Sequence, residues 1–136
     1  ISSDGVRVAV SDTSDSQVSV YDWISNRWQQ QGSSIFGVAV GDQFGSALSF
    51  SKDGTTLAIG ARNNNDTATN AGHVRVYQWD NVSWTQLGND IDGEAEGDLS
   101  GRVISLNDNG DIIAIGASEN DSQGINNLAY SCLFFE

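Results

Sequence analysis

The sequence is poor in several residue types, with no proline, no methionine, one cysteine and one histidine among 136 residues. Because Cys132 is the only cysteine, no disulfide can form within the chain, and a buried, unreactive thiol is the expected state. No apolar run approaches the roughly 18 residues that a membrane-spanning helix requires. These absences leave packing and hydrogen bonding to hold the fold together.

Basic residues are also scarce. Six Lys and Arg stand against eighteen Asp and Glu, which gives a net charge of -12. Such a surface repels phosphate backbones and anionic lipids, so we expect no nucleic-acid binding and no direct membrane binding. Cations, basic proteins and neutral glycans remain as partners.

The short motifs that accompany catalysis are missing as well. The sequence contains no nucleophile elbow, no phosphate-binding glycine loop and no metalloprotease motif. His73 has no Cys or Asp partner at metal-ligand spacing, so we expect a hydrogen-bonded strand residue rather than a ligand. We therefore predict no catalytic residues, no resident cofactor and no enzymatic activity.

What the sequence does contain is an internal repeat with a shift of 56 residues. A first, partial copy is present at the N-terminal end, because residues 4–10 match residues 53–59, with an offset of 49 instead of 56 since the next loop is seven residues shorter. A period of this size indicates one supersecondary unit that is stacked repeatedly, since a single unit cannot bury its own apolar face. The matching segments are 20–23 with 76–79, 41–45 with 97–101, and 57–61 with 113–117.

Each unit is predicted to be all β-structure. Short runs rich in Val, Ile and aromatic residues alternate with Gly, Asn, Asp and Ser, and no stretch has sustained helical periodicity. Asp53-Gly54 indicates a tight hairpin of type I′. The continuous small apolar residues of 57–61 indicate a strand that is covered on both faces. In the middle unit the four strands are expected at residues 46–51, 55–61, 73–80 and 83–88.

Four-stranded antiparallel sheets that repeat in tandem and pack face to face describe the blades of a β-propeller. A two-layer β-sandwich is the alternative, but a sandwich does not require a self-similar period. We divide the chain into a blade remnant at 1–45, a complete repeat at 46–101 and a partial repeat at 102–136. The ring is then incomplete, and neighbouring blades of a longer chain are expected partners. Residues 128–135 are either a degenerate closing strand or an effect of truncation.

Three features of the middle unit resemble the FG-GAP repeat, which occurs in the N-terminal propeller of integrin α subunits and in many cell-surface proteins. These features are Phe44-Gly45, Gly60-Ala61, and Gly72 at the start of a Val-Arg-Val-Tyr strand. The third unit has Ser100 in place of the Phe but keeps Gly101. The resemblance implies a seven-bladed propeller, a role in cell adhesion and an extracellular or cell-surface location.

Members of this family often bind Ca²⁺ in the hairpin between the first two strands of a unit. Here residues 51–55 offer one acidic residue and a lysine, too few oxygens for the six to eight ligands of Ca²⁺. We therefore do not expect the family's Ca²⁺ site in the middle unit. In the third unit, the hairpin at 107–111 contains two aspartates and two asparagines, so the sequence does not decide whether the family's Ca²⁺ site is present there.

The long connections are expected to form the functional surface. In an up-and-down meander, successive connections alternate between the two ends of the sheet. The tight turns at 52–54 and 81–82 therefore lie at one end, and the connections 62–72 and 89–101 lie at the other. Loops on a rigid scaffold often carry binding residues. The candidate ligand-binding residues are Asn63, Asn64, Asn65, Asp66, Asn70, Asp90, Asp92, Glu94 and Glu96.

Acidic residues alternate from Asp90 to Asp98, and hard carboxylate oxygens in one flexible loop suit a divalent cation such as Ca²⁺. One repeat earlier, however, the equivalent positions retain an acid only at Asp42. We therefore favour a solvated loop without metal, and keep Asp90, Asp92 and Glu94 as the alternative metal ligands.

Other repeated residues are assigned to architecture. Asp42 and Asp98 recur in Gly-Asp-x-x-Gly and are expected to accept backbone hydrogen bonds at the turn into the first strand. The four tryptophans flank the hairpin between the third and fourth strands, where cross-strand and inter-blade packing is favoured over ligand stacking. Glycosylation sequons begin at Asn65, Asn81 and Asn120.

Three functions remain open from the sequence. The first is a non-enzymatic binding module that recognises a protein or glycan at the cell surface or outside the cell. The second is a segment of a secreted enzyme, because propellers also carry hydrolase sites. The third is a purely structural repeat array without a ligand.

Overall fold

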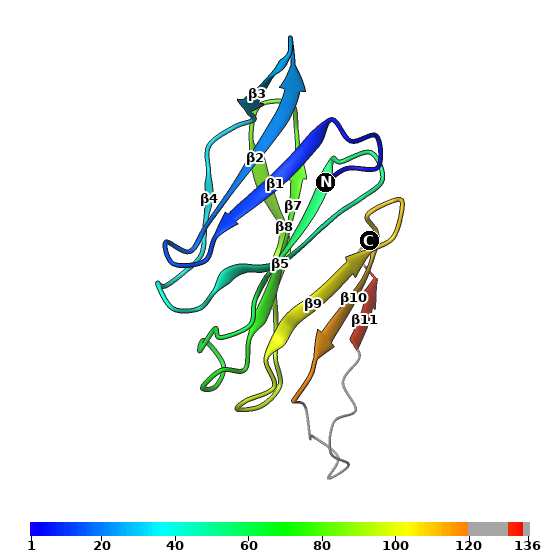
Figure 1. Cartoon of the computed structure of the whole chain (residues 1–136). Coiled ribbons are helices and arrows are strands. Elements are labelled where there is room, and N and C mark those ends of the chain that lie inside the picture. Colours follow the sequence, from blue (N-terminus) through cyan, green and yellow to red (C-terminus); the bar gives the residue numbers. More distant parts are fainter. Residues whose placement is uncertain (120–130, 135–136) are drawn as a thin grey trace.

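The computed structural model describes residues 1–119 and, for the backbone, the strand at 131–134. These residues form eleven strands in three antiparallel sheets, which follow one another in chain order from blue through green to orange and red (Figure 1). In the described part of the chain, no helix is long and apolar enough to cross a membrane.

The first sheet contains β1 (Arg7–Asp12), β2 (Gln17–Ile24), β3 (Arg27–Gln30) and β4 (Ile35–Phe36). Strand β2 lies at its centre, and both β3 and the short β4 pair with the same edge of β2 at different positions along it. The shift of 56 residues makes β3 and β4 together the counterpart of the single fourth strand of the next sheet.

The second and third sheets are simple meanders. The second has the order β5 (Phe44–Phe50), β6 (Thr56–Ala61), β7 (His73–Trp79) and β8 (Trp84–Asp92). The third has β9 (Ser100–Leu106), β10 (Ile112–Ala117) and β11 (Ser131–Phe134). Strand β11 pairs with β10 and lies within the closing strand expected at residues 128–135. Residues 128–130 and 135 lie outside the described residues.

The sheets pack face to face through two apolar cores, with the second sheet in the middle. One core joins the first and second sheets around Val18, Val20, Phe44 and Ile59. The other joins the second and third sheets, and it includes Ala58 and Val76 together with Ile104, Ile113 and Ile115. Every residue of β6 is buried, because its two faces serve the two cores. This arrangement is that of consecutive propeller blades, as predicted, and the three sheets do not close a ring.

The tight turns contain positive-φ residues as expected, but the turn type differs from the prediction. Gly54 has φ of 70°, whereas Asp53 does not have a positive φ, so the type I′ turn predicted for Asp53-Gly54 is wrong. The Gly54 amide donates to the Ser51 carbonyl at 3.0 Å, which gives an ordinary turn followed by a left-handed glycine. The Asp53 carboxylate accepts hydrogen bonds from the Ser51 hydroxyl and the Thr55 amide, and these local bonds stabilise the alternative turn.

Strand β8 is longer than predicted. The sequence placed its end at Gly88, but the strand continues to Asp92. Gly88, with φ of 65°, lies in a bulge, where the pairing shifts between Val74 with Ile91 and Val76 with Leu87. As a result, Asp90 and Asp92 lie on a strand rather than in the loop that the sequence assigned to them.

Arg7 connects the first sheet to the second. Its guanidinium binds the Asp22 carboxylate at 2.6 and 2.8 Å and donates to the Gly54 carbonyl at 2.8 Å. It also lies over the rings of Trp79 and Trp84, 5.6 and 5.7 Å from their centroids. The two rings themselves are a cross-strand pair at 5.3 Å, so these tryptophans have the packing role that the repeat predicted.

We expect Arg7→Ala to lower the free energy of unfolding by about 2 kcal/mol, because it removes a cation–π contact and leaves buried hydrogen-bonding groups without a partner. Chemical denaturation measures the change. Arg27→Ala is the matched control, because Arg27 is exposed, and it should change stability by less than about 0.5 kcal/mol. Equal effects of the two substitutions would contradict the assigned inter-sheet role.

Candidate functional site

The two long connections of the second repeat join into one surface, which we call the loop face (residues 62–72 and 93–99). The Gly97 amide donates to the Thr69 carbonyl at 2.9 Å, and the Leu99 amide donates to the Asn70 carbonyl at 3.1 Å. The Thr67 hydroxyl donates to the Gly93 carbonyl at 3.0 Å. Figure 1 shows both connections at the same end of the molecule, so the predicted clustering of the long loops is confirmed.

The tight turns lie together at the opposite end. The Lys52 amide donates to the Asp108 carbonyl at 3.0 Å, which links the hairpin of the second sheet to the hairpin of the third. The Ser3 hydroxyl donates to the Lys52 carbonyl at 2.7 Å and adds the first sheet to this end.

Most of the candidate ligand-binding residues are accessible. Asn63 and Asp90 are half-buried. Asn64 is the exception, because its side chain is 1% exposed and cannot contact a partner. The prediction that Asn64 binds a ligand is therefore wrong: its amide donates to the carboxylates of Asp42 and Asp66 at 3.0 and 3.1 Å. The exposed candidates are Asn65, Asp66, Asn70, Asp92, Glu94 and Glu96.

The two repeated aspartates hold the loop face in shape. Asp98 is buried, and its Oδ2 atom accepts hydrogen bonds from the amides of Glu94 and Ala95 at 3.1 and 2.8 Å, as expected for a turn-forming carboxylate. Asp42 is also buried, but its carboxylate accepts from the Asn64 side chain instead of from a backbone amide. Asp42 thus holds the connection 62–72 through Asn64, and Asp98 holds the turn at residues 94–98.

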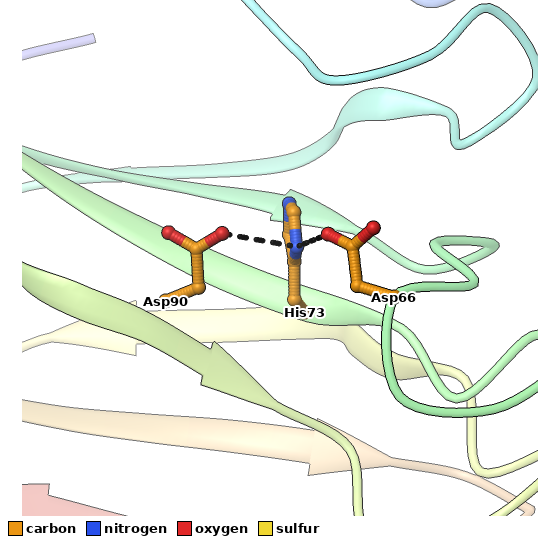
Figure 2. A group of neighbouring side chains, drawn as sticks. All are labelled: Asp66, His73 and Asp90. Carbon is orange, nitrogen blue, oxygen red and sulfur yellow. Dashed lines mark ion pairs between the residues drawn. The ribbon is translucent and has the colours of Figure 1, made fainter.

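One group of side chains beside the loop face stands out because it combines the only histidine with three carboxylates. His73 begins β7 and is completely buried. Its Nδ1 atom lies 3.8 Å from Asp66 Oδ2, 3.7 Å from Asp90 Oδ2 and 3.9 Å from Asp92 Oδ1. Figure 2 shows the imidazole between Asp66, from the loop, and Asp90, from β8. We call these four residues the His73 cluster.

Asp90 is the most firmly held carboxylate of the His73 cluster. Arg75 binds both of its oxygens, at 2.9 and 2.6 Å, and the Gln86 amide donates to Oδ1 at 2.7 Å. Burial acts to raise the pKa of Asp90, but the hydrogen bonds from Arg75 and Gln86 outweigh it and lower the pKa. Asp90 is therefore an anion at neutral pH.

His73 itself is held in the neutral form. Burial, aided by the positive charge of Arg75, lowers the pKa of the imidazole, although Asp90, Asp92 and Asp66 act in the opposite direction. Neither ring nitrogen has a hydrogen-bond partner, and the three carboxylates lie too far from Nδ1 to accept a hydrogen bond from it. The prediction from the sequence that His73 is a hydrogen-bonded strand residue is therefore wrong.

The repeat provides an internal comparison for this cluster. One period earlier, Gln17 stands at the position of His73, and Ser19 and Ser34 stand at those of Arg75 and Asp90. The Gln17 amide donates to both hydroxyls, at 3.1 and 2.8 Å. Gln17 and Ser19 line an open hollow of about 450 Å³ on the face of the first sheet. The charged arrangement is thus particular to the second sheet, where the first sheet covers the equivalent face.

Sequence reasoning missed the His73 cluster because its members do not have metal-ligand spacing along the chain. Antiparallel pairing places His73 opposite Asp92, and the bulge after Gly88 turns Asp90 toward the same nitrogen. Among the described residues, the structure groups Asp90 with Asp66 and His73 and not with Glu94, which was the proposed third ligand of the alternative metal site. The pairing of β7 with β8 was the signal that could have revealed the cluster.

The predicted glycosylation positions lie in turns and loops where the structure describes them. Asn65 is exposed, although its side-chain oxygen accepts a hydrogen bond from the Asn70 amide at 2.8 Å. Asn81 is exposed in the turn before β8 and has φ of 74°. Asn120 lies outside the described residues. Attachment of glycans to these positions stays a prediction.

Comparison with protein families identifies the middle unit. Residues 37–77 match the family model described as FG-GAP repeat. The chain carries an FG-GAP repeat. Comparison with curated proteins found no match to this sequence.

The signature residues of the FG-GAP repeat are contacts between sheets. Phe44 is completely buried in the core between the first and second sheets. Gly45 has φ of 89°, and a β-carbon there would lie 2.4 Å from the Ser11 β-carbon of the first sheet. A β-carbon on Gly60 would lie 2.1 Å from the Gly101 carbonyl oxygen of the third sheet. The phenylalanine and the glycines therefore set how closely adjacent blades approach.

The FG-GAP-containing chain also resembles solved structures over its whole length. Two crystal structures of proteins provisionally named 6-phosphogluconolactonase match it, one from Bacteroides fragilis and one from Bacteroides uniformis. The first has a TM-score of 0.64 at 15% sequence identity, and the second has 0.65 at 12%. The match covers 100% of this chain but only 38% and 39% of those proteins. At such identities the similarity shows the fold alone, a β-propeller architecture.

Proposed function

We propose that this chain is part of a non-enzymatic propeller module, similar to those of integrins, that recognises a protein or a glycan outside the cell or at its surface. The observation that carries the proposal is the loop face: two long connections, joined by backbone hydrogen bonds, present exposed amide and carboxylate side chains on a rigid sheet. Binding residues lie preferentially on loops that a rigid scaffold positions in this way.

The chemistry of the loop face favours a particular kind of ligand. Glu94 and Glu96 are exposed and acidic, and Asn65 and Asn70 add amide groups to the same surface. The net charge of -12 opposes anionic ligands. A neutral glycan, whose hydroxyls accept and donate hydrogen bonds, or a basic protein surface would complement these groups. The FG-GAP repeat supports an adhesive, extracellular role of this type.

A segment of an enzyme is the less supported alternative. The His73 cluster gathers an imidazole and carboxylates, as catalytic sites do, but His73 has no exposed surface and cannot contact a substrate. The proteins provisionally named as lactonases share the fold at 15% identity or below, which does not transfer an activity. We retain the binding role on these grounds.

The binding role predicts that reversing two charges on the loop face abolishes recognition without affecting the fold. A glycan array and a panel of lysine-rich peptides are probed with the wild-type chain and with the double variant Glu94→Lys/Glu96→Lys. Ligands of the wild type should bind the variant at least 10-fold more weakly, because a like charge now faces basic groups and the local hydrogen-bond acceptors are lost.

The matched control for this experiment is Asp108→Lys/Asp111→Lys, which changes the net charge equally at the opposite end, where both aspartates are exposed. Binding by the control should equal that of the wild type. A similar loss in both variants would indicate general electrostatics, and unchanged binding by the loop-face variant would reject the loop face as the site. Thermal unfolding shows that both variants keep the fold.

A further inference from the structure

The His73 cluster has an unusual balance of hydrogen bonds. A buried polar group without a hydrogen-bond partner is unfavourable, and native structures contain few of them. His73 is completely buried, and both of its ring nitrogens lack such a partner. Its Nδ1 atom nevertheless lies 3.7 to 3.9 Å from three carboxylate oxygens, and Figure 2 shows two of these carboxylates, those of Asp66 and Asp90. These distances are too long for hydrogen bonds but leave space for an ion between the atoms.

The charges of the cluster are also unequal. Three carboxylates, from Asp66, Asp90 and Asp92, surround the imidazole, and Arg75 supplies the one adjacent positive charge. With a neutral imidazole, the local sum is three negative charges and one positive charge, which leaves two negative charges. A divalent cation would neutralise this excess.

The geometry suits a small cation. The ligand atoms of Asp66, His73 and Asp90 all lie within 4.8 Å of one another. In a tetrahedral site with bonds of about 2.0 to 2.1 Å to nitrogen and oxygen, the ligand atoms lie about 3.3 to 3.4 Å apart. The observed separations of 3.7 and 3.8 Å between Nδ1 and the two carboxylate oxygens need to contract by a few tenths of an ångström. The two carboxylate oxygens lie within 4.8 Å of each other and need to approach by at most about 1.4 Å. Asp66 lies in a loop and can make this adjustment.

The donor set identifies the class of metal. Imidazole nitrogen is a ligand for Zn²⁺ and other first-row transition metals, whereas Ca²⁺ and Mg²⁺ prefer oxygen ligands only. We propose that Asp66, His73 and Asp90 form a binding site for a divalent transition-metal cation, with Zn²⁺ as the best match to one nitrogen and two carboxylate ligands. Asp92 adds negative charge beside the ion, and Arg75 holds Asp90 in place by hydrogen bonds to both of its carboxylate oxygens.

The first repeat supports this assignment as an internal comparison. At the position of His73 it has Gln17, whose amide is satisfied by the hydroxyls of Ser19 and Ser34. Its connection after β1 is also seven residues shorter than the connection that contains Asp66. At equivalent positions, the first sheet thus has a neutral group of side chains with satisfied hydrogen bonds. The second sheet has an anionic group whose histidine lacks hydrogen-bond partners.

A metal at this site would connect the loop face to the sheet. Asp66 belongs to the connection 62–72, while His73 and Asp90 belong to β7 and β8. The ion would therefore hold that connection in one conformation. This inference does not rest on the proposed recognition of a protein or glycan, since metal binding is measured without any such ligand.

The test uses the whole chain, freed of metal with a chelator, and titrates it with Zn²⁺ by calorimetry and in competition with a chromogenic chelator. One Zn²⁺ per chain is expected, together with a higher temperature of thermal unfolding. Two variants probe the site: His73→Gln, which introduces the side chain found in the first repeat, and Asp66→Asn, which changes an exposed loop residue. Each should weaken Zn²⁺ binding by at least about 10-fold.

Asp15→Asn is the control, because Asp15 is an exposed aspartate outside the cluster, and its affinity for Zn²⁺ should equal that of the wild type. Titration with Co²⁺ adds a spectroscopic signature, because the visible absorption of a nitrogen-ligated Co²⁺ should disappear in His73→Gln. Circular dichroism without metal shows that the variants are folded. Failure of the wild type to bind Zn²⁺, or equal affinity in wild type, His73→Gln and Asp66→Asn, would overturn the proposal.

Discussion

Replacing Gly60 by alanine is expected to lower the free energy of unfolding by about 3 kcal/mol or more. The new β-carbon would lie 2.1 Å from the carbonyl oxygen of Gly101, which belongs to the backbone of the adjacent sheet. A flexible side chain could move aside, but here the sheets must separate, and overpacking of this kind is costly. Denaturant unfolding followed by tryptophan fluorescence measures the loss.

Gly116→Ala is the matched control, because Gly116 occupies the same position one repeat later. A β-carbon there would meet the Val103 β-carbon at 3.5 Å, which is an ordinary contact. Since alanine loses less backbone entropy than glycine on folding, this substitution should be neutral or slightly stabilising. Comparable destabilisation by both substitutions would show that the inter-sheet contact is not the cause.

Replacing Phe44 by alanine should have an effect of similar or greater size. Phe44 is completely buried between the first and second sheets, where it contacts the core formed by Val18, Val20 and Ile59. Truncation of a buried phenylalanine removes its transfer free energy and leaves a cavity, which together cost about 3–5 kcal/mol. Because single domains are stable by about 5–15 kcal/mol in total, a large part of the stability would be lost.

Phe36→Ala provides the comparison for the same side chain in an exposed position. Phe36 lies in the short strand β4 and is 61% exposed, so its truncation should change stability by less than about 1 kcal/mol. The midpoint of denaturation should therefore decrease strongly for Phe44→Ala and little for Phe36→Ala. A small effect of Phe44→Ala would mean that the signature phenylalanine of the FG-GAP repeat does not stabilise the contact between blades.

Much of the fold could be predicted from the sequence because local signals and the repeat agree. The strand that contains Leu57 and Ile59 is continuously apolar, and it is the strand that both cores cover. The glycine of Asp53-Gly54 was correctly assigned a positive φ, although the turn around it is of another type. The prediction of tight turns at one end and long connections at the other required no distances, because successive connections of an antiparallel meander alternate between the two ends of the sheet.

The candidate site could be predicted only in part, because it depends on features that have no local signal. A glycine that follows a strand pattern predicts the end of the strand, but Gly88 lies in a bulge after which β8 continues. That continuation moves Asp90 and Asp92 out of the expected loop and beside His73. The burial of Asn64 likewise depends on the buried carboxylate of Asp42, which lies before β5 and is separated from Asn64 by two strands of the chain.

The hydrogen bonds that join the two long connections also cross from one sheet to the next. Gly72, immediately before β7, forms a parallel bridge with Ser100 of β9, and the Ser100 amide donates to the Ala71 carbonyl at 2.8 Å. A ligand on this surface would therefore read the junction of two repeats instead of a single one. Under the binding role proposed above, specificity would depend on both repeats, and exchange of one repeat between related proteins would transfer it only in part.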